Sequence, residues 1–208
     1  MFLVYGLQKS GFSIIKLLLK KNINFRIWDD DKNIRNNLKN KFDNHLFFNK
    51  RNDNLTDFEK IFVSPGISLR QKKFNIKNKA NKLNRDLNLY LSNLVDQKVI
   101  AITGTNGKST TTKLIGDILK KNKIKTFVGG NIGEPLCNSL IANKKFDFHV
   151  IELSSFQLET VKKMDTKISI ITNLANDHLD RYKNISDYIN QKKNVISQNG
   201  INLISLDD

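Results

Sequence analysis

The sequence is poor in several residue types, and each scarcity excludes a class of protein. Its 208 residues include one cysteine, Cys137, so no internal disulfide can form and a reducing, cytoplasmic location is expected. No apolar run approaches the length of a membrane span, and the first apolar residues pass straight into a glycine turn at residues 6–11. Neither a signal peptide nor a membrane partner is therefore expected. The length allows one large domain or two small ones.

Acidic residues are also scarce: 20 of them stand against 35 Lys and Arg, which gives a formal net charge of +15. A balance of this kind is typical of nucleic-acid-binding proteins. The lysines, however, are scattered among asparagines and isoleucines, and aromatic residues do not alternate with them as stacking platforms would. We therefore expect no nucleic-acid partner and interpret the charge as a solvated surface that helps to attract anionic ligands.

The most informative stretch is residues 99–119, where a short apolar run predicts a buried strand and an amphipathic segment predicts a helix. Between them lies a loop with two glycines, followed by Lys108 and Ser109. This order is typical of a phosphate cradle, because N–H groups at the helix start face the anion, the lysine adds charge and the hydroxyl binds the nucleotide's magnesium. Ile102 stands where the usual pattern has its first glycine. A glycine-containing helix start without a ligand is the alternative.

The first part of the chain predicts a β-α-β unit. Strands are expected at residues 2–5 and 24–28 and a helix at 12–21, with acidic residues from Asp29 onward. Dinucleotide-binding folds place a ribose-binding acid at this point. Only two of the three fingerprint glycines are present, so we expect a nucleotide-type ligand here and not a redox cofactor. A tight turn beside a solvated acidic loop is the alternative.

Strands and helices are expected to alternate along the rest of the chain. Residues 70–94 are interpreted as one helix, one short strand and a linker, with a domain boundary between 92 and 98. Further strands are expected at 46–48, 61–64, 125–128, 146–153, 167–172 and 201–205, and helices from about 134, from 154 and over 185–198. The pattern predicts an α/β protein with a Rossmann-like domain over residues 1–94 and a P-loop domain with a mainly parallel sheet over 95–208. Its site should lie along the carboxyl ends of the strands.

Three polar side chains are candidates for that edge. Glu152 ends the expected strand at 146–153 and could share an edge with Lys108, where a carboxylate is a natural ligand for a nucleotide's magnesium. His178 lies in the next strand-end loop, although a lone histidine is more often structural. Lys192 shares a helix face with Tyr188, four residues earlier, but spacing alone does not distinguish it from the many solvated lysines.

Four motifs in this order resemble the Mur ligases, the ATP-dependent amide-forming enzymes of peptidoglycan precursor synthesis. They are T-G-T-N-G-K-S-T (103–110), G-G-N-I-G (129–133), E-L-S-S-F-Q-L-E (152–159) and T-N-L-A-N-D-H-L-D-R-Y (172–182). The first is the family's own form of the phosphate loop and accounts for the missing glycine. The other three are most similar to the branch of the family that adds D-glutamate. Residues 1–98 resemble the family more loosely.

The resemblance implies a reaction and a set of site residues. ATP would convert the terminal carboxylate of UDP-N-acetylmuramoyl-L-alanine to an acyl phosphate, which the amine of D-glutamate would then attack. The implied ATP-binding residues are Gly104, Thr105, Asn106, Gly107, Lys108, Ser109 and Thr110. The implied catalytic residues are Lys108, Glu152, His178 and Lys192, and the implied magnesium ligands are Ser109, Glu152, His178 and Lys192. The implied substrate-binding residues are Ser10, Asp29, Ser64 and Asn131. Lys192 would be carbamylated, with Lys193 as the alternative if the helix register slips by one residue.

The sequence departs from the family in two places. Arg85 stands before Asp86 where the family usually has a glycine. The chain also stops at Asp208, whereas the family's central domain continues and a third domain supplies most of the amino-acid site. The sequence therefore resembles an N-terminal fragment, and we expect it to be inactive in ligation by itself and to leave an exposed sheet edge.

The resemblance places the complete enzyme, expected to be a monomer, in cell-wall synthesis and hence in cell shape and division. Two alternatives stay open at this point. The chain could belong to a sister Mur ligase or a folylpolyglutamate-synthase-type ligase, or it could be a non-catalytic nucleotide-binding module.

Overall fold

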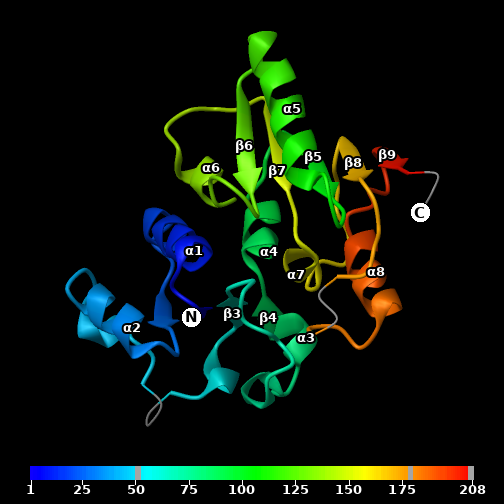
Figure 1. Ribbon diagram of the computed structural model, residues 1–208. Coiled ribbons are helices and arrows are strands. Elements are labelled where there is room, and N and C mark those ends of the chain that lie inside the picture. Colours follow the sequence, from blue (N-terminus) through cyan, green and yellow to red (C-terminus); the bar gives the residue numbers. More distant parts are fainter. Residues whose placement is uncertain (50–52, 178–179, 206–208) are drawn as a thin grey trace.

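The computed structural model describes residues 1–49, 53–177 and 180–205, which form two parallel sheets surrounded by helices (Figure 1). The first sheet has the order β2-β1-β3-β4. Its strands are β1 (Phe2–Tyr5), β2 (Phe25–Trp28), β3 (Lys60–Val63) and β4 (Leu83–Asn84). Tyr5 is level with both Trp28 and Val63, so the first three strands end together at one edge.

The second sheet has the order β6-β7-β5-β8-β9, and every pairing is parallel. Its strands are β5 (Lys98–Thr103), β6 (Thr126–Gly130), β7 (Phe148–Glu152), β8 (Ile168–Ile171) and β9 (Ile201–Ile204). Glu152 is level with both Ile102 and Gly130, so the phosphate loop and the end of β7 meet at the same edge. The α/β class predicted from the sequence is confirmed. All four residues of the edge strand β9 are exposed.

Helices connect most of the successive strands. They are α1 (Lys9–Lys20), α2 (Lys32–Lys39), α3 (Lys79–Lys82), α4 (Asp86–Leu91), α5 (Lys108–Lys121), α6 (Asn138–Ile141), α7 (Ser155–Leu158) and α8 (Ile185–Lys193). Side chains define several of their starts: Asp31 accepts a hydrogen bond from the N–H of Asn33 at α2, and Asn184 does the same for Asp187 at α8. Among the described residues, none of the helices combines the length and the apolar character needed to span a bilayer.

Before residue 60, one expected strand is replaced by other structure, and one helix is present that was not expected. Residues 46–48 do not form a strand, because a 3₁₀ turn at Asn44–Leu46 leads into a single bridge between Phe47 and Ile27. Helix α2 was not predicted, because residues 32–39 contain only two apolar residues and therefore give almost no helical periodicity.

Two helix boundaries in the second half also differ. The helix expected from about residue 134 begins at Asn138, because Glu134 bridges to Gly129 and its carbonyl oxygen accepts the N–H of Gly130, which keeps this segment extended. Helix α8 ends at Lys193, five residues short of the expected 198. Neither difference moves a strand end or the phosphate loop.

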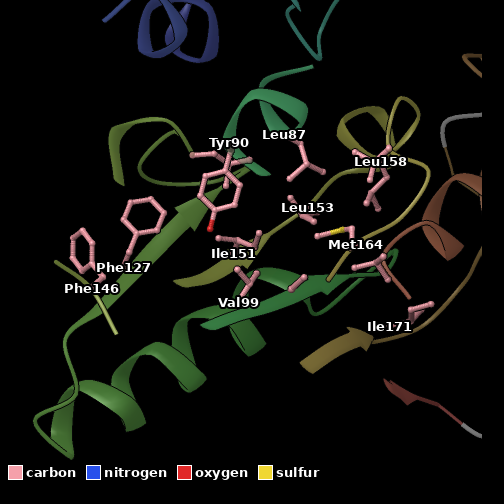
Figure 2. Packing of buried hydrophobic residues seen from close by; sticks show 14 residues of the cluster. Leu87, Tyr90, Val99, Phe127, Phe146, Ile151, Leu153, Leu158, Met164 and Ile171 are labelled. Carbon is pink, nitrogen blue, oxygen red and sulfur yellow. The ribbon is translucent and has the colours of Figure 1, made fainter. Parts of the chain in front are cut away.

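The largest core cluster covers one face of the second sheet and includes residues from α4 (Figure 2). Leu87 and Tyr90 of α4 pack with Val99 of β5 and Ile151 of β7, and none of these side chains is more than 2% exposed. Leu89, on another face of α4, belongs to the cluster that α1 forms with the first sheet. This short helix therefore takes part in both cores and fixes the two sheets against each other.

His149 makes the stability of this core depend on pH. It is the second residue of β7, is 1% exposed, and its Nδ1 is 2.7 Å from the hydroxyl of Tyr90. Burial lowers the pKa of His149 from its ordinary 6.5 to about 4. Below pH 6.5 the unfolded chain takes up a proton that the native histidine does not accept, so stability present above pH 6.5 is lost as the pH falls.

We expect His149 to lower the free energy of unfolding by about 2 kcal/mol between pH 7 and pH 5. Urea unfolding at several pH values would measure this slope. His149→Asn places an amide oxygen near the position of Nδ1, where it can accept the Tyr90 hydroxyl, and it should therefore have a flatter slope. Equal slopes in the two proteins would contradict the prediction.

Candidate functional site

The loop between β5 and α5 has the shape of an anion cradle. Gly104 and Gly107 adopt positive φ values of 146° and 78°, and α5 begins at Lys108 directly after the second of them. The first N–H groups of such a helix have no partner within the helix and point toward the space in front of it. Lys108 folds back over the loop, and its Nζ donates to the carbonyl oxygen of Thr105 at 2.7 Å. Thr110, at the third position of α5, is exposed.

The loop is held from behind by residues that follow β8. The N–H of Thr105 donates to the carbonyl oxygen of Asn173 at 2.9 Å, and the N–H of Asn106 donates to the Asn173 side-chain oxygen at the same distance. The Thr172 hydroxyl donates to the carbonyl oxygen of Asn106 at 2.6 Å. A Cβ at position 104 would lie 2.0 Å from the Thr172 hydroxyl oxygen, so only glycine fits there. The cradle is therefore preformed.

Glu152 brings three elements together at the edge of the second sheet. It is the last residue of β7 and 1% exposed, and one carboxylate oxygen accepts the hydroxyl of Ser109 at 2.7 Å. The other carboxylate oxygen accepts the side-chain amide of Asn131 at 2.9 Å. A Cβ at Gly130 would lie 2.2 Å from the carbonyl oxygen of Glu152, which explains the glycine before Asn131.

This cluster of oxygen atoms has the chemistry that magnesium prefers. Within the described ranges, no three side chains of the His, Cys, Asp or Glu type gather into a metal site. One carboxylate and one hydroxyl are nevertheless what a nucleotide-bound magnesium requires of a protein, because phosphate oxygens and water complete its coordination. Ser109 and Glu152 therefore fit the ion. The prediction made for His178 lies outside the described residues.

Lys192 is buried beside the phosphate loop. It is 2% exposed, and its Nζ donates to the carbonyl oxygen of Gly104 at 2.6 Å. Burial, with a smaller contribution from the charge of Lys108, lowers the pKa of Lys192 to about 8. Tyr188 lies beneath its ammonium group, 4.6 Å from Nζ to the ring centroid. Lys193 is exposed, so the register of α8 turns Lys192 toward the loop and Lys193 away from it.

The first sheet brings its three predicted residues to one edge. Ser64 directly follows β3 and is half-buried. A Cβ added at Gly6 would lie 2.6 Å from the Cβ of Ser64, so the two loops approach closely. Ser10 is half-buried in the first turn of α1. Asp29 is 7% exposed, and its carboxylate accepts the N–H groups of Leu7 at 2.7 Å and Asp31 at 2.9 Å. Asp29 therefore shapes the loop after β1, which sequence reasoning did not anticipate.

Sequence reasoning missed the residues that support these two sites. Thr172 and Asn173 hold the phosphate loop, and the signal that could have identified them is their position directly after a strand that neighbours β5. Arg85 was noted only as a departure from a family pattern, but it is 0% exposed and lies between the two sheets. Nothing in its local sequence predicts that burial.

The chain matches two family models. The model described as the Mur ligase middle domain matches residues 102–208, and the one described as the Mur ligase MurD-like, N-terminal domain matches residues 1–83. The UDP-N-acetylmuramoylalanine--D-glutamate ligase of Rickettsia prowazekii is 37% identical over 196 residues, covering 94% of this chain and 43% of the relative. The ligase of the same name from Wolbachia pipientis is 35% identical and covers 99% of this chain and 40% of the relative. The chain thus spans less than half the length of these relatives.

Solved structures show the same fold at low sequence identity. The UDP-N-acetylmuramate:L-alanyl-gamma-D-glutamyl-meso-diaminopimelate ligase of Neisseria meningitides superposes with a TM-score of 0.54 at 12% identity, covering all of this chain and 71% of that one. The UDP-N-acetylmuramate-alanine ligase of Thermotoga maritima superposes with a TM-score of 0.50 at 20% identity, covering 93% of this chain and 46% of that one.

Proposed function

Since the chain belongs to the Mur ligase family, we propose that it forms the nucleotide-substrate and ATP-binding parts of a ligase that joins D-glutamate to UDP-N-acetylmuramoyl-L-alanine. The observation that carries this proposal is the hydrogen-bonded cluster of Ser109, Glu152 and Asn131 beside a preformed phosphate loop. The curated relatives described above, which carry the name of that ligase, support the choice of substrates.

The residues of the second sheet divide the work of phosphoryl transfer. The N–H groups at the start of α5 would bind the phosphates of ATP, and Lys108 would leave Thr105 to neutralise them. Ser109 and Glu152 would hold magnesium, which offsets the negative charge on the transferred phosphoryl group when bound. Asn131 already bonds to Glu152 and lies exposed at the same edge, where it would contact the substrate.

Lys192, which lies behind the phosphate loop, would supply a negatively charged group for a second metal ion. In a carbamylated form, its ammonium group would have lost one proton, and the resulting amine would have added carbon dioxide and lost a second proton, so the buried cation would become an anion. That anion would suit a second metal site, as the family resemblance implies. The burial of Lys192 against Gly104, with Lys193 pointing away, supports Lys192 over its neighbour as the modified residue.

The first sheet would bind the uridine-nucleotide substrate. Ser64 and Ser10 lie where two strands end, and Asp29 keeps the loop between them in shape. We further propose that the complete enzyme is a cytoplasmic monomer that contributes to cell-wall synthesis and, through it, to cell division. The reaction would follow from positioning the terminal carboxylate of the substrate on the first sheet, which accepts the phosphoryl group, against the phosphates held by the second sheet.

Calorimetric titration with UDP-N-acetylmuramoyl-L-alanine, with and without Mg-ATP, tests the proposal. We expect the folded chain to bind the substrate, and Ser64→Ala to weaken that binding about fivefold by removing one hydrogen-bonding group. Ser92→Ala removes an exposed hydroxyl at the end of α4 and is the control. Asp29→Asn is preferable to Asp29→Ala, because the alanine would also release the loop after β1. A folded chain that binds neither ligand would overturn the proposal.

A further inference from the structure

Arg85 is buried between the two sheets and bonds to the turn that follows β3. Its guanidinium donates to the carbonyl oxygens of Val63 at 2.9 Å, Ser64 at 2.6 Å and Ile67 at 3.0 Å. The side chain is 0% exposed, so water cannot replace these bonds. Three carbonyl groups, at the end of β3 and in the turn after it, therefore accept hydrogen bonds from one side chain, and the Ser64 carbonyl also accepts the N–H of Ile67.

The same guanidinium reaches the second half of the molecule. It forms an ion pair with Glu159, which directly follows α7 and whose side chain is 17% exposed. The next residue, Asp86, is also buried and accepts the side-chain amide of Gln157 in α7 at 3.0 Å. Helix α7 begins three residues after Glu152, so these contacts connect the turn after β3 to the segment that leaves the nucleotide site.

Arg181 completes the set of donors. Its guanidinium donates to the carbonyl oxygens of Gly66 at 3.3 Å and Pro65 at 3.4 Å. It also lies over the ring of Phe156 in α7, 4.1 Å from the ring centroid. All five carbonyl groups of residues 63–67 thus accept hydrogen bonds from two arginines that contact α7 or its end.

We propose that Arg85 is a positioning residue. It fixes the turn at residues 63–67, and with it the Ser64 hydroxyl, in one position relative to the second sheet and its phosphate loop. This inference rests on the proposed function only in assigning Ser64 to the substrate. The planar fork of an arginine can serve several carbonyl oxygens and a carboxylate at once, whereas a lysine is a point charge with a different geometry. A glycine at this position would make none of these contacts.

Because the ion pair between Arg85 and Glu159 is largely buried, its loss should destabilise the turn at residues 63–67. Removing one partner of a buried ion pair leaves the other charge and several carbonyl oxygens without compensation. The pair between Arg70 and Asp187 joins the same two halves at the surface, where the Arg70 side chain is 45% exposed. Exposed pairs of this kind contribute little, so Arg70 provides a matched control.

Hydrogen–deuterium exchange on peptides covering residues 60–70 tests the inference without any ligand. We expect Arg85→Lys to speed exchange in these peptides about tenfold, with Glu159→Gln giving a smaller effect and Arg70→Lys none. In parallel, Arg85→Lys should weaken UDP-N-acetylmuramoyl-L-alanine binding about tenfold and leave Mg-ATP binding within about twofold. Glu159→Gln keeps Arg85 in place and serves if Arg85→Lys does not fold.

Three results would overturn the inference. The first is unchanged exchange over residues 60–70 in both Arg85→Lys and Glu159→Gln. The second is faster exchange spread equally over β1 and α1, since Arg85 would then only stabilise the fold. The third is a loosened turn with full substrate affinity. A wild-type chain that does not bind the substrate would reject the proposed function, while the exchange measurement would still decide the role of Arg85.

Discussion

Replacing Lys108 with alanine is expected to weaken Mg-ATP binding about 100-fold, because it removes charge-assisted hydrogen bonds to the phosphates. The lysine is the first residue of α5, and its ammonium group already lies over the loop through its bond to the carbonyl oxygen of Thr105. Moving from that carbonyl to a phosphate exchanges a neutral acceptor for a charged one. Titration calorimetry with Mg-ATP measures the loss directly.

The matched control for this experiment is Lys113→Ala. Lys113 lies on the same helix and is exposed, so its removal changes the net charge equally without touching the cradle. It should alter the affinity by less than about twofold, since exposed charges are screened by solvent and salt. Equal losses in the two variants would show that overall positive charge, and not the phosphate loop, attracts the nucleotide.

The phosphate loop could be predicted from the sequence because its signal is local. A strand, two glycines, Lys108 and Ser109 follow one another within a dozen residues, and each local preference agrees with the others. Glu152 could be placed beside the loop because parallel strands bring their carboxyl ends to one edge. The structure adds the contacts that spacing cannot give, such as the bond between Glu152 and Asn131.

Other features could not be predicted because they depend on residues that are distant in the chain. From the sequence alone, an arginine is expected to be a solvated charge. Arg85 is buried because carbonyl groups of residues 63–67 and the carboxylate of Glu159 surround its guanidinium. Spacing alone did not distinguish Lys192 from Lys193, and the resemblance favoured Lys192 with Lys193 as the alternative. The packing of α8 turns Lys192 inward and leaves Lys193 exposed. Asp29 occupies the expected position, but both of its oxygens accept backbone N–H groups.

Gly11→Ala is expected to lower the free energy of unfolding of the first sheet by about 3 kcal/mol, at the upper end of overpacking costs. A Cβ at position 11 would lie 1.8 Å from the carbonyl oxygen of Gly6 and 2.9 Å from its carbonyl carbon. The obstacle is backbone at the end of β1, so no side-chain rotation can relieve it. Helix α1 would have to move away from the sheet, and its buried residues Ile14 and Leu18 would lose their packing.

The single tryptophan makes this measurable, because Trp28 ends β2 and its fluorescence reports on the first sheet. Urea unfolding of wild type and Gly11→Ala gives the difference in stability. Gly66→Ala is the control: a Cβ there meets nothing within 4 Å, so it should change the stability by less than about 0.5 kcal/mol. If Gly11→Ala were as stable as Gly66→Ala, α1 could not approach β1 as closely as the structure places it. The positions of Ser10 and Ser64 relative to each other, which depend on this close approach, would then also be wrong.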